Sequence, residues 1–472
     1  LGTAIVNRRL QRIANAADAP IISGRASATD FFDIQRQAQV RVQAREGEWQ
    51  RALEVSEQEW RRALEHGFSD AELAEQLANF EQRYRDAARQ QDTRRNRQLA
   101  ESILSTARRD RIFITPQTSY DLFLAHKPEI TAEAVSQAFA QHFALSDPLI
   151  HVSTKQAIPD AERTILETWR NSAARPVAAA QGRDGLAFAY DDFGQPSAIA
   201  EDTMIADLDV RTIRFENNVR LNLKFTDFEK DRLRYAIRIG SGKLALPATE
   251  MGQASFLSSV GALGGLGEHS YDELRQILAG HRLTYGFHTG EDKFSVRGSG
   301  TMADLPLQMR LSAAYVGDPG LRSEMLSRWQ TILPPYLVQL DATPQAVARA
   351  QVARLVADGN PRFGIPSEAD LAGVSLDAAR RLITPQFAAA PIEISIVGDF
   401  DADAVIAAVA ETFGALPPRA ATLDEWESER LARFTADRSE RVLTHAGAPD
   451  QALAMTIWPT TDDDDAQEEA TM

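Results

Sequence analysis

Eight histidines are the side chains in this sequence that are best suited to bind a transition metal. No two of them stand four positions apart, so neither His-x-x-Glu-His nor His-x-x-x-His, which place two imidazoles on one helical face, occurs. The chain has no cysteine and therefore offers no thiolate ligand, thiol nucleophile or disulfide. These residue types predict no histidine-based metal site within the chain.

Four other groups could carry chemistry, and each has a simpler structural interpretation. The cluster from Glu268 to Glu273 lies where a loop enters a helix, and acidic side chains there favour the helix dipole. His281 and His288 flank one predicted strand at an odd separation, so their side chains would point to opposite faces. The glycine-rich stretch from Gly261 to Gly267 lacks the Lys-Ser/Thr ending of a phosphate loop and is better interpreted as a connector. The acidic run Asp462 to Asp465 is most simply a solvated tail.

Length and charge exclude several classes of protein. At 472 residues the chain is long enough for about three domains, or two large ones. Its formal net charge of −16 argues against a nucleic-acid partner, and the arginine-rich helix from Arg94 to Arg109 is interpreted as a solvated face paired with acids. No apolar run approaches the length of about 18 residues that a membrane span needs.

Hydrophobic periodicity predicts helices and strands in mixed order, which is typical of an α+β or an α/β fold. Helix starts are marked by capping boxes at Ser69 and Ser270 and by caps at Thr131, Thr343 and Ser375. We expect helices near 1–18, 47–67, 69–84, 94–109, 131–143, 249–260, 270–280, 343–358, 375–387 and 401–413. We expect strands near 21–28, 39–44, 149–154, 186–190, 212–215, 219–225, 232–239, 283–288, 293–297 and 391–397.

An internal repeat is visible. Ile130 to Phe143, followed by a proline and the predicted strand 149–154, parallels Val374 to Phe387, followed by a proline and the strand 392–397. In both copies the phenylalanine lies 13 positions after the first apolar residue. The agreement in cap, helix length, proline and strand favours duplicated modules.

The stretch from Ala389 to Pro418 resembles a known family. It combines a strand, a Gly398-Asp399 turn and an amphipathic helix, and its pattern IxxVGDFDxDxVxxxVxxxFGxLP is similar to the closing unit of a module in the pitrilysin/insulinase family of zinc peptidases, the inverzincins. The resemblance implies an α+β fold of repeated modules, each an antiparallel-rich mixed sheet packed with helices.

Active members of that family carry His-x-x-Glu-His on a helix that follows a Gly-Ser pair. In this chain the corresponding helix follows Gly240-Ser241, and the aligned positions are Ser255, Ser258 and Ser259. A serine hydroxyl is a poor zinc ligand and cannot replace a carboxylate base. The resemblance therefore implies an inactive module, with no catalytic, cofactor-binding or metal-binding residue in this chain.

The resemblance also suggests a division of the chain. Residues 1–155 would be the second, non-catalytic module of an N-terminal half, truncated at its start, because the Asn7-Arg8-Arg9-Leu10 helix and the helix entry at Gly67 to Leu73 match the family. A linker over 156–205, an inactive module over 206–420 and the truncated start of a fourth module over 421–472 would follow. Because the chain begins at Leu1 inside a predicted helix, we expect a piece of a longer bacterial protein.

The leading hypothesis is a non-catalytic part of a zinc-dependent metalloendopeptidase. It would form the wall of a peptide-enclosing chamber and support a catalytic module of the same parent chain, where zinc is expected, while being inactive alone. Its partners would be that module and unfolded peptide substrates, with no nucleic acid and no membrane span. The alternative is a non-enzymatic scaffold or peptide-binding subunit of the same descent. Family resemblance suggests the periplasm, whereas the residues leave the compartment, substrate and oligomeric state open.

Overall fold

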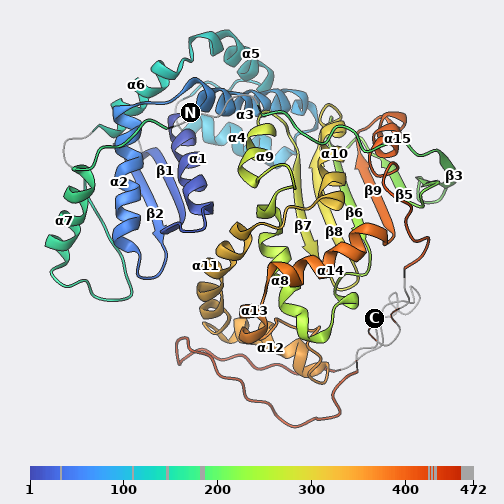
Figure 1. Cartoon of the computed structure of the whole chain (residues 1–472). Coiled ribbons are helices and arrows are strands. Elements are labelled where there is room, and N and C mark those ends of the chain that lie inside the picture. Colours follow the sequence, from blue (N-terminus) through green and yellow to red (C-terminus); the bar gives the residue numbers. More distant parts are fainter. Residues whose placement is uncertain are drawn as a thin grey trace.

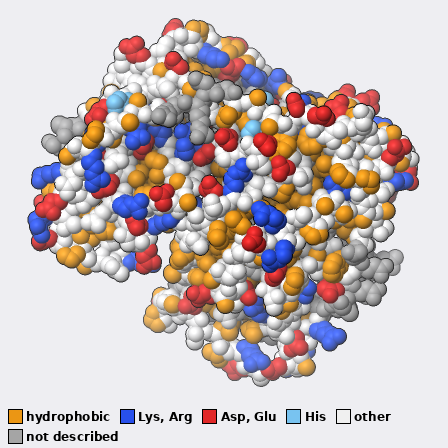
Figure 2. All heavy atoms as spheres, viewed as in Figure 1, with side chains coloured by type: hydrophobic (Ala, Val, Ile, Leu, Met, Phe, Trp, Pro, Cys, Tyr) orange, Lys and Arg blue, Asp and Glu red, His pale blue; other side chains and the backbone are white. Residues whose placement is uncertain are grey.

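A computed structural model of the chain describes residues 1–31, 34–108, 111–144, 148–180, 186–423, 426, 429 and 433–458. The described residues form two parts that lie side by side, a smaller one rich in helices and a larger one built on a sheet (Figure 1). Charged side chains of both signs are interspersed on the face that Figure 2 shows, so the negative net charge is not gathered there.

The smaller part is an antiparallel hairpin with helices around it. Its elements are α1 (Gly2–Asn15), β1 (Ile21–Phe31), β2 (Gln35–Ala44), α2 (Trp49–Glu65), α3 (Asp70–Arg89), α4 (Asn96–Arg108), α5 (Pro116–His126), α6 (Ala132–Phe143) and α7 (Ala161–Ala173). Its core packs Val6 and Leu10 of α1 against Ile21 of β1 and Phe139 of α6. Helix α1 also covers β1, because the Asn7 side-chain amide donates to the Ala26 carbonyl and accepts from the Ala26 N–H.

The larger part contains a seven-stranded sheet in the order β3-β4-β5-β9-β6-β8-β7. Its strands are β3 (Ile199–Ile205), β4 (Val210–Phe215), β5 (Arg220–Phe225), β6 (Leu233–Ile239), β7 (Thr284–Thr289), β8 (Phe294–Gly300) and β9 (Ile392–Gly398). All neighbours pair antiparallel except β5 and β9, which are parallel. The last strand along the chain therefore lies in the middle of the sheet.

Helices cover one face of this sheet. They are α8 (Met251–Val260), α9 (Tyr271–Ile277), α10 (Leu305–Gly317), α11 (Ser323–Leu340), α12 (Pro344–Val356), α13 (Glu368–Ala372), α14 (Leu376–Ala389) and α15 (Ala402–Glu411). In β6 the residues Leu233, Tyr235 and Ile237 are buried against them, whereas the alternate residues Arg234 and Arg238 are exposed. This alternation of apolar and polar residues is what leaves one face open.

The local signals of the sequence agree with the structure. Both predicted capping boxes, at Ser69 and Ser270, are present with their reciprocal hydrogen bonds. The side chains of Thr131, Thr343 and Ser375 cap α6, α12 and α14 as expected. These interactions join residues three positions apart, so nearby residues are sufficient to specify them.

Two predicted strands are wrong. Neither 149–154 nor 186–190 forms a strand, and Leu149 is 97% exposed. A strand needs a neighbour to pair its backbone groups, and neither segment has one among the described residues. The two copies of the internal repeat therefore agree in their helices α6 and α14 but not in the strand that follows. The segment 156–205 contains α7 and β3, and Trp169 of α7 lies 5.8 Å from Trp60 of α2 between ring centroids.

Candidate functional site

Helix α8 carries the three serines that the sequence singled out. It begins at Met251, two residues later than Thr249, and packs beside the edge strand β7. Ser255 and Ser258 are half-buried and Ser259 is exposed. Because positions three and four apart share one face of a helix, the structure brings these hydroxyls together.

One of these hydroxyls is already engaged. Ser258 Oγ accepts a hydrogen bond from the Thr289 N–H of β7 at 2.9 Å. This contact ties the helix to the end of the edge strand, and nothing in the serine spacing predicted it. Within the described ranges, no group of three or more His, Asp or Glu side chains could hold a metal ion.

The cluster from Glu268 to Glu273 is structural. His269 is 6% exposed, and its Nε2 accepts the Ala189 N–H at 2.8 Å. Glu273 belongs to the capping box of α9. The hydrogen bond between Ala189 and His269 attaches the segment 186–190, which precedes β3, to the loop before α9.

The remaining sequence candidates also have structural partners. His281 Nδ1 lies 2.7 Å from Asp304 Oδ1, whereas His288 is exposed, so the two do not converge. The glycine-rich loop turns its carbonyls toward Arg322, which donates to Gly264, Leu266 and Gly267. A loop that presents carbonyls to a guanidinium is not a phosphate cradle. The run from Asp462 to Asp465 lies outside the described residues.

The contact between the two parts was missed at the sequence level. Arg8 of α1 is 6% exposed and lies between α3 and α9. Its Nε donates to Glu75 at 3.1 Å, its Nη1 to the Asp272 carboxylate at 2.8 Å and its Nη2 to the Asp272 carbonyl at 2.9 Å. The only local signal was a pair of arginines on an otherwise amphipathic helix, which does not reveal a partner 264 positions away.

A second group of ion pairs extends the same contact along α3. Asp86 faces Arg282 at 3.2 Å, and Arg89 faces Asp231 at 2.6 Å. Burial raises the pKa of Asp86, although the Arg282 guanidinium acts in the opposite direction. The Gly280 N–H also donates to Asn79 at 3.0 Å. The two parts are therefore held by a charged and partly desolvated surface.

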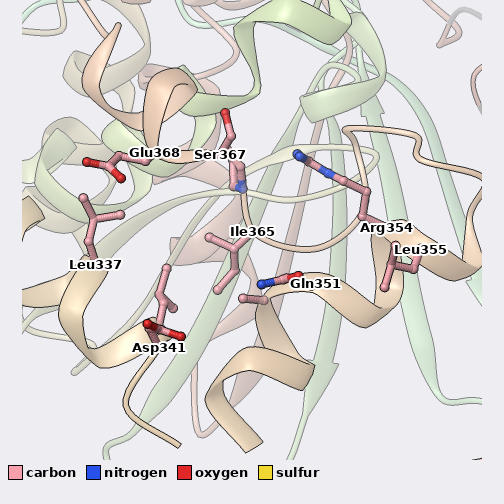
Figure 3. A pocket seen from close by; sticks show the side chains of 11 residues that line it. Leu337, Asp341, Gln351, Arg354, Leu355, Ile365, Ser367 and Glu368 are labelled. Atoms are coloured by element: carbon pink, nitrogen blue, oxygen red, sulfur yellow. The ribbon is translucent and has the colours of Figure 1, made fainter. Parts of the chain in front are cut away.

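A pocket of about 390 Å³ lies between α11, α12 and the segment 365–368 (Figure 3). Its wall is mainly aliphatic, with Leu337, Leu355 and Ile365 exposed to the cavity. Arg354 and Glu368 stand on opposite sides of it. The Ser367 hydroxyl donates to Asp370 in the capping box of α13, and no histidine lines the cavity. The pocket can bind a small group but does not present a nucleophile beside a base.

Comparison with known proteins gives relatives for part of the chain, although no protein-family model matches it. The chain is 24% identical over 289 residues to the "Probable zinc protease PqqL" of Escherichia coli, which covers 59% of this chain and 30% of that protein. It is 22% identical over 218 residues to the chloroplastic stromal processing peptidase of Pisum sativum, covering 43% of this chain and 16% of that protein. Each of these sequence matches thus covers less than a third of the relative's length.

A solved structure shares the fold over most of this chain. The ferredoxin protease FusC, solved in complex with Arabidopsis ferredoxin, is 15% identical with a TM-score of 0.54, and the match covers 90% of this chain and 47% of that one. The periplasmic protease PqqL from Escherichia coli is 20% identical with a TM-score of 0.46, and this match covers 89% of this chain and 47% of that one. None of the helices in the described ranges is long and apolar enough to cross a bilayer.

Proposed function

Since the chain is related over part of its length to the pitrilysin/insulinase-like zinc proteases, we propose that it is a non-catalytic portion of such a metalloendopeptidase. The observation that carries the proposal is the composition of α8. Ser255, Ser258 and Ser259 stand on the helix that we align with the zinc helix of the family, and hydroxyls cannot replace two imidazoles and a carboxylate.

The proposed role is architectural. We assign residues 1–155 to the non-catalytic module of an N-terminal half, 156–205 to a connecting segment, 206–420 to an inactive module and 421–472 to the start of a further one. The buried ion pairs around Arg8 support a fixed arrangement of the first and third of these units. Such an arrangement suits the wall of a chamber that encloses an unfolded peptide while a catalytic module of the same parent protein holds zinc.

The compartment follows from the same relationship. The solved PqqL structure is described as a periplasmic protease, and we propose the periplasm for this chain as well. The absence of cysteine is equally compatible with the cytosol and with the periplasm, so it does not bear on this proposal.

Metal content and proteolysis test the proposal. The purified chain should contain no stoichiometric zinc by mass spectrometry and should cleave no peptide from a quenched fluorescent library. Co-expression with the catalytic module should produce cleavage that a chelator abolishes and that neither part shows alone. Chelator-sensitive cleavage by this chain alone would refute the proposal. If the parent gene encodes no His-x-x-Glu-His motif, the alternative function, a non-enzymatic scaffold or peptide-binding subunit, takes the place of this proposal.

A further inference from the structure

Two arginines face each other on the hairpin of the smaller part. Arg25 of β1 and Arg41 of β2 are direct partners in the strand register, and both are exposed. Directly opposed residues on one face have Cβ atoms about 5 Å apart, so the two guanidinium groups are neighbours. No hydrogen bond or ion pair joins either side chain to another described residue.

Among the described strand positions, the rest of that hairpin face between Ser23 and Thr29 and between Gln37 and Gln43 is polar and carries no acid. Along β1 and β2 the odd-numbered positions from Ser23 to Thr29 and from Gln37 to Gln43 share it, and apart from the two arginines they are Ser23, Ser27, Thr29, Gln37, Gln39 and Gln43. Opposed pairs on this face are linked weakly, Gln39 donating to Ser27 at 3.3 Å. The even-numbered positions include Ala26 and Val42, which pack toward the core of the smaller part.

Two further arginines lie near the open end of the hairpin. Arg45 follows β2 directly and donates to the Ala17 carbonyl. Arg328 of α11 donates to the Ile22 carbonyl of β1 at 2.8 Å. Burial lowers the pKa of Arg328, and the nearby charge of Arg45 lowers it further. Arg45 and Arg328 are half-buried and bind backbone carbonyls, so we call Arg25 and Arg41 alone the arginine patch, and neither of these two has a carboxylate partner among the described residues.

This arrangement is unfavourable for the isolated chain. Like charges directly opposite each other in a strand pair are destabilising, and no acid in the described part of the chain pairs with them, although the sequence carries 67 acidic residues against 51 basic ones. Places where a protein breaks a local stability rule without internal compensation are typically functional. Guanidinium groups bind carboxylates through paired hydrogen bonds, and the serine and glutamine side chains on either side of the two arginines can pair with a peptide backbone.

We propose that the arginine patch binds the carboxylate side chains of an acidic peptide segment in extended conformation. Side chains on one face of an extended peptide recur about every 7 Å, the same spacing as successive positions on the hairpin face. The choice of a peptide as the ligand rests on the proposed function. The arginine patch adds to that function a substrate class, acidic segments, that the chamber wall would bind.

Fluorescence anisotropy with labelled peptides tests the patch. One peptide alternates Glu with Ala, and the control alternates Gln with Ala. The chain should bind the Glu peptide at least tenfold more tightly than the Gln peptide, and affinity should fall as salt rises. The variant R25Q/R41Q should lose at least tenfold in affinity for the Glu peptide. The matched variant R97Q/R349Q removes two exposed arginines from α4 and α12, and should change the affinity by less than twofold.

Thermal unfolding separates a binding role from a structural one. R25Q/R41Q should unfold at the same temperature as the unmodified chain or a higher one, because the substitution removes repulsion. Equal binding of both peptides, or equal losses in both variants, would overturn the proposal. Equal competition by a short DNA oligonucleotide would also overturn it, because the patch would then recognise charge alone. The assay requires no cleavage, so its failure would not refute the proposed role beside a catalytic module, and zinc-dependent cleavage by this chain would not refute the patch.

Discussion

At the scale of single residues, Glu59 shows how the smaller part tolerates a buried charge. Its side chain is 4% exposed and pairs with Arg62 at 3.1 Å, while its Oε2 is buried without a partner among the described residues. Burial raises the pKa of Glu59 above the ordinary value of 4.5, and Arg62 and Arg9 only partly oppose this. The folded chain therefore holds a proton on Glu59 more tightly than the unfolded chain does.

The raised pKa predicts a pH-dependent effect of Glu59→Gln. Above pH 4.5 the folded state binds more protons at Glu59 than the unfolded state does. The contribution of the Glu59 side chain to the stability of the wild-type chain therefore declines as the pH rises from 4.5 through the folded-state pKa. Glutamine cannot ionise, so the variant should be more stable than wild type near about pH 7 and should converge with it near about pH 4. Urea denaturation at both pH values measures the gap, and Glu65→Gln on the same helix is the exposed control. A gap that widened on acidification would contradict this account.

At the scale of elements, α8 works as a packing helix. Met251, Phe256, Leu257 and Val260 are buried, and the Phe256 ring meets the Trp329 ring of α11 edge-on at 5.9 Å. Its polar side contributes the hydrogen bond from Thr289 to Ser258. The helix that we align with the zinc helix therefore stabilises the edge of the sheet here.

Removing this hydrogen bond should destabilise the larger part. Ser258→Ala leaves the Thr289 N–H without its acceptor, and an unsatisfied buried donor costs about 1–3 kcal/mol. Ser259→Ala changes an exposed hydroxyl on the same helix and should alter the free energy of unfolding by less than about 0.5 kcal/mol. Chemical denaturation of both variants measures the difference. Equal changes in the free energy of unfolding in the two variants would show that the hydrogen bond to Ser258 does not stabilise the larger part.

At the scale of the whole molecule, charged contacts connect the two parts. Arg8 reaches Glu75 within its own part and Asp272 in the other, so one buried guanidinium is shared across the boundary. Arg282 to Asp86 and Arg89 to Asp231 act in parallel. Each part also has its own apolar core, which stabilises that part separately. The charged contact therefore determines how the two parts are arranged rather than whether each one folds.

Arg8→Ala should uncouple the two parts. The substitution leaves the buried Glu75 carboxylate and the partly buried Asp272 carboxylate without their shared cation, a loss of about 3–5 kcal/mol for a buried pair. We expect the single thermal transition to separate into two, with the smaller part unfolding first, as differential scanning calorimetry would show. Arg36→Ala breaks the exposed pair with Asp30 and should leave the transition unchanged. A single transition in Arg8→Ala would mean that apolar contacts couple the parts.

The sequence by itself determined the features that depend on neighbouring residues. The capping boxes at Ser69 and Ser270 and the strand-turn-helix unit after Pro391 were predictable for this reason. The same applies to the candidate site, since the helical spacing of Ser255, Ser258 and Ser259 can be seen in the sequence alone.

Only the tertiary structure decided which distant groups meet. It placed β9 between β5 and β6, left 149–154 unpaired, joined Arg8 to Asp272 and gave Ser258 its donor on β7. Pairing along a sheet and the burial of a charge are settled by whichever partner the whole fold brings within a few ångströms. The hydrogen bonds and ion pairs that a side chain can form depend on its residue type and can be read from the sequence. The partner that it binds depends on the tertiary structure.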